Sequence, residues 1–408
     1  MMNKTLMKKI FPVFLVALLL VSCEEESNPT FDSENFTTIF DNNQFSATYN
    51  PIDFRQTADG GYLVLGTREL AGSNFKGIYL MKADKFGKFV VEVDVEEQYV
   101  HPVESLTEID GRFYFFCMDE LNVQAHIAEI SADAEVLSMT PVNGVTYPSS
   151  AAYADNKFIV QGYNHADRET VVALVNKDGS VGQSKNFAIG IGDTDDLHAK
   201  ILNHYIRTGR QFPFSVGRSG SLYYFNGFYD FTFTMAYTDL NDDEPAGLIQ
   251  GQQENGGLSF VLPLGGNKFA ASVYNFGDNY FLPNVNLPTS GVSSTVILSE
   301  SALTIPELVP DAKVRIIKAT VDEKSNVIFG GTTISKQIGL FFYDEATGVF
   351  QSSRHFGFSN PFEIGNVIQT SDGGLAICGT TFLAGRFPRI CIFKISKEEL
   401  ARSSKEDQ

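Results

Sequence analysis

The sequence contains no tryptophan and, among 408 residues, only 6 histidines and 4 cysteines. Sugar-binding surfaces commonly use large flat aromatic side chains, so a glycan site here would depend on tyrosine. The Gly-x-Ser-x-Gly elbow, the His-Glu-x-x-His helix and the glycine-rich phosphate loop are all missing. The sequence therefore predicts no catalytic residue. It favours a non-enzymatic function while leaving enzymatic activity open.

Cysteine is too sparse to indicate a disulfide framework, and histidine is too sparse to indicate a metal centre. Besides Cys23 there are three cysteines, Cys117, Cys378 and Cys391, which cannot all pair. Cys378 and Cys391 lie on successive predicted strands, so a cross-strand disulfide and two free thiols are both compatible with the sequence. His198 and His204 are six residues apart and lack further ligands at tetrahedral spacing, so no metal site is predicted.

Basic residues are also few, with 31 Lys and Arg against 49 Asp and Glu. This balance argues against nucleic acid as a partner and against a basic membrane-binding patch. The acidic clusters 193–196 and 239–244 mix carboxylates and amides, the ligand type that calcium prefers. Neither cluster has the twelve-residue calcium loop. Solvated turns are the favoured interpretation, calcium is the alternative, and no cofactor is predicted.

No apolar run is long enough to span a bilayer as a helix, which requires about 20 residues. The longest N-terminal run, 11–21, contains eleven residues and follows three lysines, Lys4, Lys8 and Lys9. A basic start, a short apolar stretch and small residues at its end are typical of a secretory signal. The sequence thus predicts a signal peptide over residues 1–22.

The residues at the end of this stretch, Leu20-Val21-Ser22-Cys23, resemble the lipobox of bacterial lipoproteins. The resemblance implies cleavage before Cys23 and lipidation of that residue by acyl chains, palmitate among them. Glu24, Glu25 and Glu26 resemble the acidic export signal of surface-exposed lipoproteins in the Bacteroidetes. Residues 23–34 would form a polar, lipidated tether. The implied location is the outer membrane, facing the cell exterior.

A repeated motif predicts the fold. Gln-Thr-x-Asp-Gly-Gly, an apolar run and Gly-Thr occur at 56–67 and again at 369–380. In each copy a strand ends at Gln-Thr, Asp-Gly-Gly reverses the chain, and an apolar strand follows. Further strands at 78–84 and 89–95 complete four strands in about 45 residues, which is typical of one propeller blade.

Weaker copies fill the chain between the two strong ones. Segments 103–142, 148–187 and 311–357 each predict four strands, and 198–310 holds two decorated copies whose first strand cannot be placed from the sequence. We therefore predict an all-β protein with a single β-propeller over 35–396, of seven blades, with six or eight as alternatives. Residues 397–408 form a short polar tail.

The two ends of the chain predict how the ring would close. The last copy stops after its third strand, at Ile395, whereas a spare strand, 35–40, precedes the first copy. This N-terminal strand would complete the last blade and cover its exposed edge. We expect residues 36–40 to pair with 391–395.

The repeat resembles a bacterial propeller repeat of the Gln-Thr-x-Asp-Gly-Gly-Tyr type, which is similar to kelch repeats. The resemblance implies the fold and transfers no active site. In the family it resembles, such proteins often accompany TonB-dependent transporters and SusD-like lipoproteins. It therefore implies an outer-membrane protein partner or a ligand for a binding propeller.

The candidate binding residues lie in the decorated region. Residues 274–290 are predicted to form a long loop that exposes Tyr280, Phe281 and Leu282 to a partner. Rings are also dense at 223–233, where a core and a binding patch are both open interpretations. The alternative function is a glycan-binding or glycan-cleaving propeller, for which Tyr223, Tyr229 and Tyr280 are the candidate rings.

Overall fold

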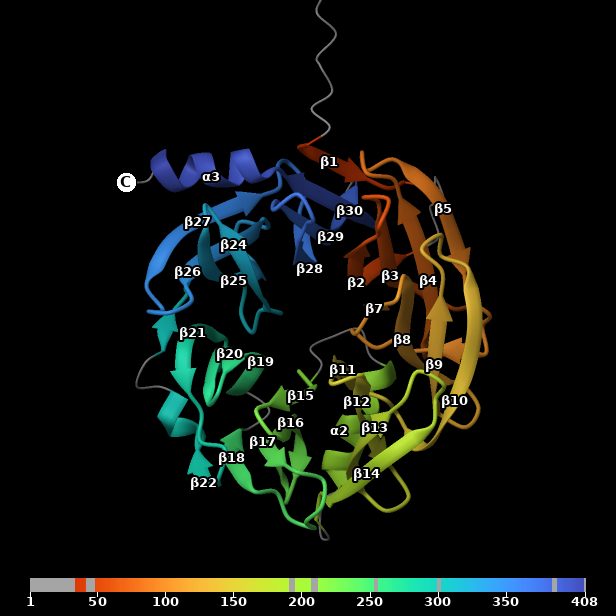
Figure 1. The fold of residues 1–408 in the computed structure, drawn as a ribbon. Coiled ribbons are helices and arrows are strands. Elements are labelled where there is room, and N and C mark those ends of the chain that lie inside the picture. The colour runs from red at the N-terminus through yellow and green to blue at the C-terminus, as the bar shows by residue number, and fades with distance from the viewer. Residues whose placement is uncertain are drawn as a thin grey trace, which may run out of the picture. The chain divides into compact units, whose positions relative to one another are not determined.

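The computed structural model describes residues 34–41, 48–190, 195–206, 212–252, 256–298, 302–383 and 387–406. These residues are arranged as antiparallel sheets that follow one another around a common centre (Figure 1), and the all-β prediction is confirmed. No helix in the described ranges is long and apolar enough to cross a membrane.

The described residues of the first half of the chain form fourteen strands. They are β1 (Phe36–Ile39), β2 (Tyr49–Gln56), β3 (Tyr62–Glu69), β4 (Lys76–Ala83), β5 (Phe89–Asp94), β6 (Tyr99–Val100), β7 (Thr107–Ile109), β8 (Arg112–Asp119), β9 (Gln124–Ile130), β10 (Val136–Thr146), β11 (Ser150–Ala154), β12 (Lys157–Asn164), β13 (Glu169–Val175) and β14 (Val181–Ala188).

The second half begins with a helix and ends with another. Its elements are α2 (Asp195–Ile206), β15 (Ser215–Ser219), β16 (Leu222–Tyr229), β17 (Thr232–Thr238), β18 (Gly247–Gln252), β19 (Gly256–Gly265), β20 (Lys268–Asn275), β21 (Asp278–Asn286), β22 (Gly291–Ser294), η1 (Thr295–Leu298), β23 (Leu303–Thr304), β24 (Arg315–Val321), β25 (Lys324–Thr332), β26 (Ile338–Asp344), β27 (Phe350–Phe356), β28 (Phe362–Gln369), β29 (Leu375–Leu383), β30 (Phe387–Ile395) and α3 (Lys397–Glu406).

Most sheets are groups of four strands in chain order. β11–β14 and β24–β27 are two such sheets, and β19, β20, β21 and β23 form a third. β2–β5 and β7–β10 are two further groups that the short strand β6 joins into one nine-stranded sheet. β22 adds to β15–β18 in parallel, as the fifth strand of that sheet. The predicted copies at 103–142, 148–187 and 311–357 therefore correspond to real groups.

The turns between first and second strands follow from the sequence. Asp110-Gly111 and Asp155-Asn156 all have positive φ, between 48° and 75°. Consecutive positive φ values define the tight hairpin turn that matches strand twist, and Asp, Asn and Gly adopt it at low cost. These dipeptides thus fix the register of their hairpins.

The two strong repeat copies use a longer turn whose two glycines have different roles. Gly60 and Gly373 both have φ of 83°, where glycine is favoured. Gly61 and Gly374 leave no room for a side chain. A Cβ atom would lie 2.5 Å from the Ala83 oxygen in the first copy and 2.2 Å from the Ile395 oxygen in the second.

A buried lysine that the motif did not reveal contacts each of these turns. Lys82 is 1% exposed, and its Nζ lies 3.0 Å from Asp59 Oδ1, the aspartate of the first turn. Lys394 Nζ lies 2.8 Å from Asp372 Oδ2 in the second copy. Each lysine comes from the third strand of its group. The aspartate therefore fastens the turn to that strand, since a buried charge requires a partner.

The glutamine of the motif connects neighbouring groups. Gln56 Oε1 accepts the Ser371 N–H at 2.7 Å, which links the first group to the last. Gln369 Oε1 accepts the Thr320 N–H at 3.1 Å, and its Nε2 donates to the Thr320 carbonyl at 2.8 Å. The motif therefore stabilises contacts between groups as well as its own turns.

The N-terminal strand lies at the predicted place. β1 pairs antiparallel with β30, with Phe36 opposite Lys394 and Ile39 opposite Cys391. The resulting sheet has the order β1-β30-β29-β28, so the first strand of the chain completes the last group of strands. This pairing is the predicted one.

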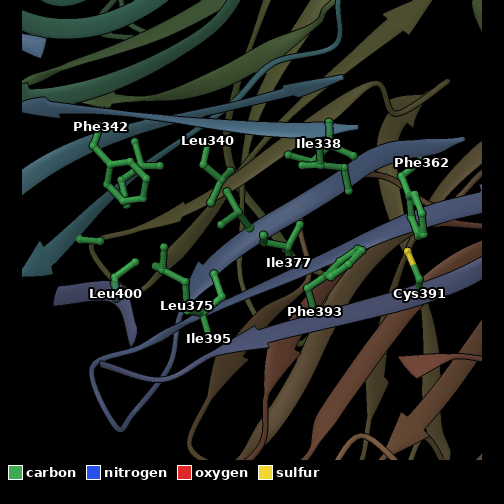
Figure 2. Close-up of a cluster of buried hydrophobic side chains, with 14 residues drawn as sticks. Ile338, Leu340, Phe342, Phe362, Leu375, Ile377, Cys391, Phe393, Ile395 and Leu400 are labelled. Atoms are coloured by element: carbon green, nitrogen blue, oxygen red, sulfur yellow. The ribbon is translucent and has the colours of Figure 1, made fainter. Parts of the chain in front are cut away.

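Each space between neighbouring groups is filled by its own apolar core. Figure 2 shows one of them, between β26 and the strands β28, β29 and β30. Leu340 and Ile377 are fully buried, and Leu400 of α3 closes the cluster at 2% exposure. Central strands such as β3 and β26 are buried on both faces, which explains their unbroken apolar runs.

The structure resolves the pairing of Cys378 and Cys391 that the sequence left open. Cys378 and Cys391 are free and do not form the disulfide left open above. Gly379, and not Cys378, lies opposite Cys391, so the two side chains point into different cores. Within the decorated region, β22 ends at Ser294 and η1 follows.

Candidate functional site

The connections between successive groups of strands emerge on one side of the molecule. In an antiparallel group, the loop between second and third strands and the connection to the next group emerge at the same end. Helix α2 is such a connection, between β14 and β15. We call this side the α2 face. The opposite side carries the Asp-Gly-Gly turns.

Helix α2 is amphipathic and covers an apolar cluster. Leu197, Ile201 and Tyr205 recur every fourth residue and so share one side of the helix. They pack with Tyr163 and Phe228, which belong to different sheets. The Tyr205 hydroxyl donates to the Tyr147 carbonyl, and His198 Nδ1 lies 2.6 Å from the Tyr163 hydroxyl. The helix is thereby fixed to several groups at once.

Two histidines meet where α2 approaches the connection between β6 and β7. The rings of His101 and His204 have centroids 5.8 Å apart and meet edge to face. Burial lowers the pKa of His101 to about 4, against a raising effect of Glu104. Burial and the neighbouring His101 lower the pKa of His204 to about 3. Both rings are therefore neutral at pH 7.

Glu104 is the carboxylate beside these histidines, and it binds two cations. Lys313 Nζ contacts its Oε1, and Arg315 Nη2 contacts its Oε2. Partial desolvation opposes the charge of this 40% exposed carboxylate, but Arg315 and Lys313 outweigh it and hold the pKa of Glu104 at about 2. Arg315 also donates through Nε to the Gly365 carbonyl at 2.9 Å. The cluster connects groups that are not neighbours in the chain.

Because the pKa values of His101 and His204 are lowered, we expect the stability of the fold to depend on pH. A histidine whose folded pKa lies below its unfolded value near 6.5 favours the unfolded state once that state becomes protonated. The free energy of unfolding should therefore fall as pH drops from about 6.5 towards 3. The wild type should lose unfolding free energy between pH 7.5 and 4.5, and replacing His204 with Phe should make this loss about 2 kcal/mol smaller, as measured by urea unfolding.

The matched control for this prediction is His165→Asn, because His165 is exposed. It should keep the wild-type pH profile. The ion pairs of Glu104 act in a different pH range from the histidines. The stability that they provide is lost only below pH 4.5. An identical pH profile for wild type and His204→Phe would contradict the assignment.

Large apolar side chains are exposed at the loop tips of the α2 face. Phe276 is 75% exposed between β20 and β21, Ile334 is 61% exposed between β25 and β26, and Phe358 is 60% exposed between β27 and β28. Leu121 and Phe231 are further exposed tips on this face, at 90% and 48%. Large apolar residues at loop tips are typical of interaction surfaces when several share one face.

The loops that carry Phe276, Ile334 and Phe358 are linked to one another by backbone hydrogen bonds. The connection before β24 bonds to both neighbouring loops: Asp311 N–H donates to the Gly277 carbonyl and Ile334 N–H to the Glu307 carbonyl. Phe362 N–H in turn donates to the Lys336 carbonyl. We call these three side chains the apolar row. Their positions are fixed by the loops that carry them.

The loops of the α2 face are acidic as a whole. The loops of this face expose more carboxylates than cations, and Lys336 is one of the few exposed cations on them. Such a surface would favour a partner with basic residues around an apolar centre. The exposed carboxylates belong to Glu96, Glu97, Glu120, Asp167, Asp230, Asp278 and Glu307.

Comparison with known proteins adds the fold family. No protein-family model matches the sequence, and no curated protein matches it. Solved structures do match: the Dos1 propeller superposes with a TM-score of 0.50 at 10% identity, over 88% of this chain and 93% of that chain. The chain has a β-propeller fold.

Two further structures are similar at the same low identity. The β-propeller domain of the Trilobed protease from Pyrococcus furiosus matches with a TM-score of 0.47 at 10% identity, over 85% of this chain and 93% of that chain. Raptor from Chaetomium thermophilum matches with a TM-score of 0.50 at 10% identity, over 85% of this chain and 28% of that chain. At 10% identity, the two matches with a TM-score of 0.50 show the fold alone, and the groups of strands are propeller blades.

The predicted binding loop is wrong. Tyr280, Phe281 and Leu282 lie within β21, which begins two residues after β20 ends. Phe281 is fully buried and stacks on Phe329 with centroids 4.3 Å apart, while Leu282 is 1% exposed. A two-residue Phe-Gly turn replaces the expected long loop, because Gly277 adopts a φ of 97°. The exposed residue of this segment is Phe276.

The dense rings at 223–233 belong mostly to the core. Tyr224, Phe225, Phe228 and Phe233 are at most 4% exposed, whereas Phe231 is exposed. Strand alternation and packing on both faces explain this burial. The three tyrosines considered for glycans, Tyr223, Tyr229 and Tyr280, are half-buried and come from two different sheets.

The acidic and histidine candidates do not assemble into a metal site in the described part of the chain. No group of three or more His, Cys, Asp or Glu residues there is arranged to hold a metal ion. Asp239 accepts from the Asn241 N–H, and Lys185 pairs with Asp243, so that cluster is a turn fastened to β14. Asp193 lies outside the described residues, as do Cys23 and Glu24–Glu26.

Sequence reasoning missed the apolar row and the helix α2. A signal for the row was present in the triplet Asn275-Phe276-Gly277, where a phenylalanine stands at a turn position that is usually polar. The helix could have been found from the apolar residues four apart at 197, 201 and 205. No local signal indicated the ion pairs of Glu104, since their partners are about 210 residues away.

Proposed function

We propose that this protein is a lipid-anchored lipoprotein of the outer-membrane surface whose propeller binds a protein partner through the apolar row. The observation that carries the proposal is the exposure of Phe276, Ile334 and Phe358 on loops of one face that backbone hydrogen bonds link together. Burying three such side chains would contribute several kcal/mol, at about 1.5–3 kcal/mol each when fully buried.

The propeller of this proposal has seven blades and is closed by β1. Seven groups of four strands can be counted when β1 is assigned to the last group and the nine-stranded sheet is divided at β6. β2 also contacts β28, so the first and last groups are neighbours. A closed ring would form a rigid platform, on which loop tips keep fixed positions.

The anchor of this proposal is Cys23, with Glu24–Glu26 as export signal. The support is the residue order at the N-terminus together with the direction of β1. Phe36 pairs near the end of β30, beside the Asp-Gly-Gly turn of the last blade. The N-terminal end of β1 therefore lies on the side opposite the α2 face.

The partner of this proposal is an integral outer-membrane protein, such as a TonB-dependent transporter with its SusD-like lipoprotein. The acidic rim of the α2 face favours a partner whose contact surface is basic around an apolar centre. The charge would guide association and the apolar row would provide most of the affinity.

Co-purification tests the docking face. Changing Phe276, Ile334 and Phe358 together to Ser should abolish recovery of the partner from detergent-solubilised native outer membrane. The reason is that apolar anchors at the centre of an interface dominate its binding energy. Because all three side chains are exposed, the melting temperature should remain that of the wild type.

The matched control changes three exposed apolar residues outside the α2 face, namely Leu137, Val349 and Phe350, to Ser. This variant should recover the same outer-membrane protein as the wild type. If the apolar-row variant recovers as much partner as the wild type, the partner binds elsewhere. If the control variant loses the partner to the same extent as the apolar-row variant, the recovery reflects non-specific adhesion.

A further inference from the structure

A groove opens on the rim of the propeller where β1 meets the first blade. It has a volume of about 350 Å³ and lies between β1 and the strands β4 and β5. This volume is within the range of small-molecule sites. Its lining residues are Thr38, Ile39, Phe40, Asp41, Tyr49, Tyr79, Phe89, Glu92 and Ile390. We call it the joint groove.

Aromatic rings form the apolar part of the joint groove. Tyr49 and Tyr79 pack with ring centroids 4.5 Å apart and are 7% and 4% exposed. Phe89 is 53% exposed at the mouth of the groove. Aromatic faces attract cations through the ring quadrupole, so such a wall favours a positively charged ligand group.

A bulge in β5 brings Phe89 into this position. The register between β4 and β5 shifts between Lys82 and Ala83, which places Phe89 opposite Ala83 and leaves Val90 unpaired. Without the extra residue, Phe89 would point to the same side as Val91, into the next core. Bulges often redirect a side chain in this way beside binding sites.

Glu92 supplies the negative charge of the groove. The Tyr79 hydroxyl donates to Glu92 Oε2 at 2.6 Å. Burial raises the pKa of Tyr79, and the bond to Glu92 raises it further, so Tyr79 remains a neutral donor. Asp41, the other carboxylate, is already matched by Arg389, whose Nε lies 2.9 Å from its Oδ1. The Glu92 carboxylate is thus held in place by a neutral hydroxyl and keeps its negative charge without a cationic partner among the described residues that line the groove.

We propose that the joint groove binds a small organic cation, an ammonium or guanidinium group carried on an apolar stem. The cation contacts Glu92, and the stem packs on Tyr49, Tyr79 and Phe89. This site is separate from the apolar row, which lies at the loop tips of the α2 face. It requires no partner protein.

Ligand-observed NMR titration of the full protein tests this proposal with two matched probes. Phenethylamine carries a cation on an aromatic stem, and 3-phenylpropionate carries an anion on a similar stem. The protein should bind the amine, and the anion should bind at least about tenfold more weakly, since like charge at Glu92 repels it. Equal binding of the two probes would overturn the proposal.

Three variants assign the binding to the groove. Glu92→Gln keeps the shape and removes the charge, so the affinity for phenethylamine should fall about tenfold. Phe89→Ser should also weaken it, and Glu108→Gln, which changes an exposed carboxylate on β7, should leave it unchanged. Unchanged affinity in Glu92→Gln would refute the site. Thermal unfolding of each variant confirms that the protein remains folded.

A second titration distinguishes a free amine from a lysine side chain of a polypeptide. A capped peptide, acetyl-Gly-Lys-Gly amide, is compared with phenethylamine at equal concentration. Preference for one probe identifies the source of the cation, and failure of both overturns the proposal. The apolar-row variant should bind the preferred probe like the wild type, so this outcome is independent of the docking experiment.

Discussion

Proline at position 38 is expected to lower the free energy of unfolding by about 3 kcal/mol, because it should detach the strand that completes the last blade. Phe40 N–H donates to the Ile390 carbonyl, and antiparallel alternation gives Thr38, opposite Ile392, the same bonded position. Proline there removes the N–H. Ile39 and Phe40, which pack against two neighbouring cores, would lose part of their burial.

Thr37→Pro is the matched control. Thr37 is exposed and lies one residue away, at the alternate position where its N–H points away from β30. Urea unfolding monitored by circular dichroism should show a much smaller change for this variant. If both prolines have the same effect, β1 does not contribute to stability through its pairing with β30.

Replacement of Cys23 with Ser is expected to move the protein from the membrane fraction to the soluble fraction. The reason is that stable anchoring needs acyl chains, and serine does not offer the thiol that would carry one. Cell fractionation with immunoblotting measures the distribution. Cys117→Ala, which changes a buried core residue, should leave the protein in the membrane fraction.

The export signal requires a separate variant. Changing Glu24, Glu25 and Glu26 to Ala should keep the protein in the membrane fraction but protect it from protease added to intact cells. A membrane-bound Cys23→Ser protein would refute the anchor. Equal protease sensitivity of wild type and the glutamate variant would refute the export signal alone.

Prediction from the sequence succeeded where the physical cause is local. The turn dipeptides Asp110-Gly111 and Asp155-Asn156 require positive φ, which few other residues adopt easily. The repeat at 56–61 and 369–374 likewise identified two equivalent turns. Since four strands per repeat cannot bury their faces alone, the sequence implied stacked sheets and a propeller.

Prediction failed where burial depends on distant segments. Phe281 and Leu282 look like exposed anchors in the sequence, yet β21 places them against residues of two different cores. Phe276, two residues before that strand, is the exposed ring. A difference of a few residues in the start of a strand decides which side chain is buried, and only packing fixes that start.

The sequence alone determined the repeat, the turn positions, the spare N-terminal strand and the pattern typical of a lipoprotein signal, because each depends on neighbouring residues. The tertiary structure decided the rest. It assembled Glu104 with Lys313 and Arg315, set His101 against His204 of α2, and exposed Phe276, Ile334 and Phe358 on loops of one face. These groups come from separate blades, and the packing of blades around a common centre brings them together.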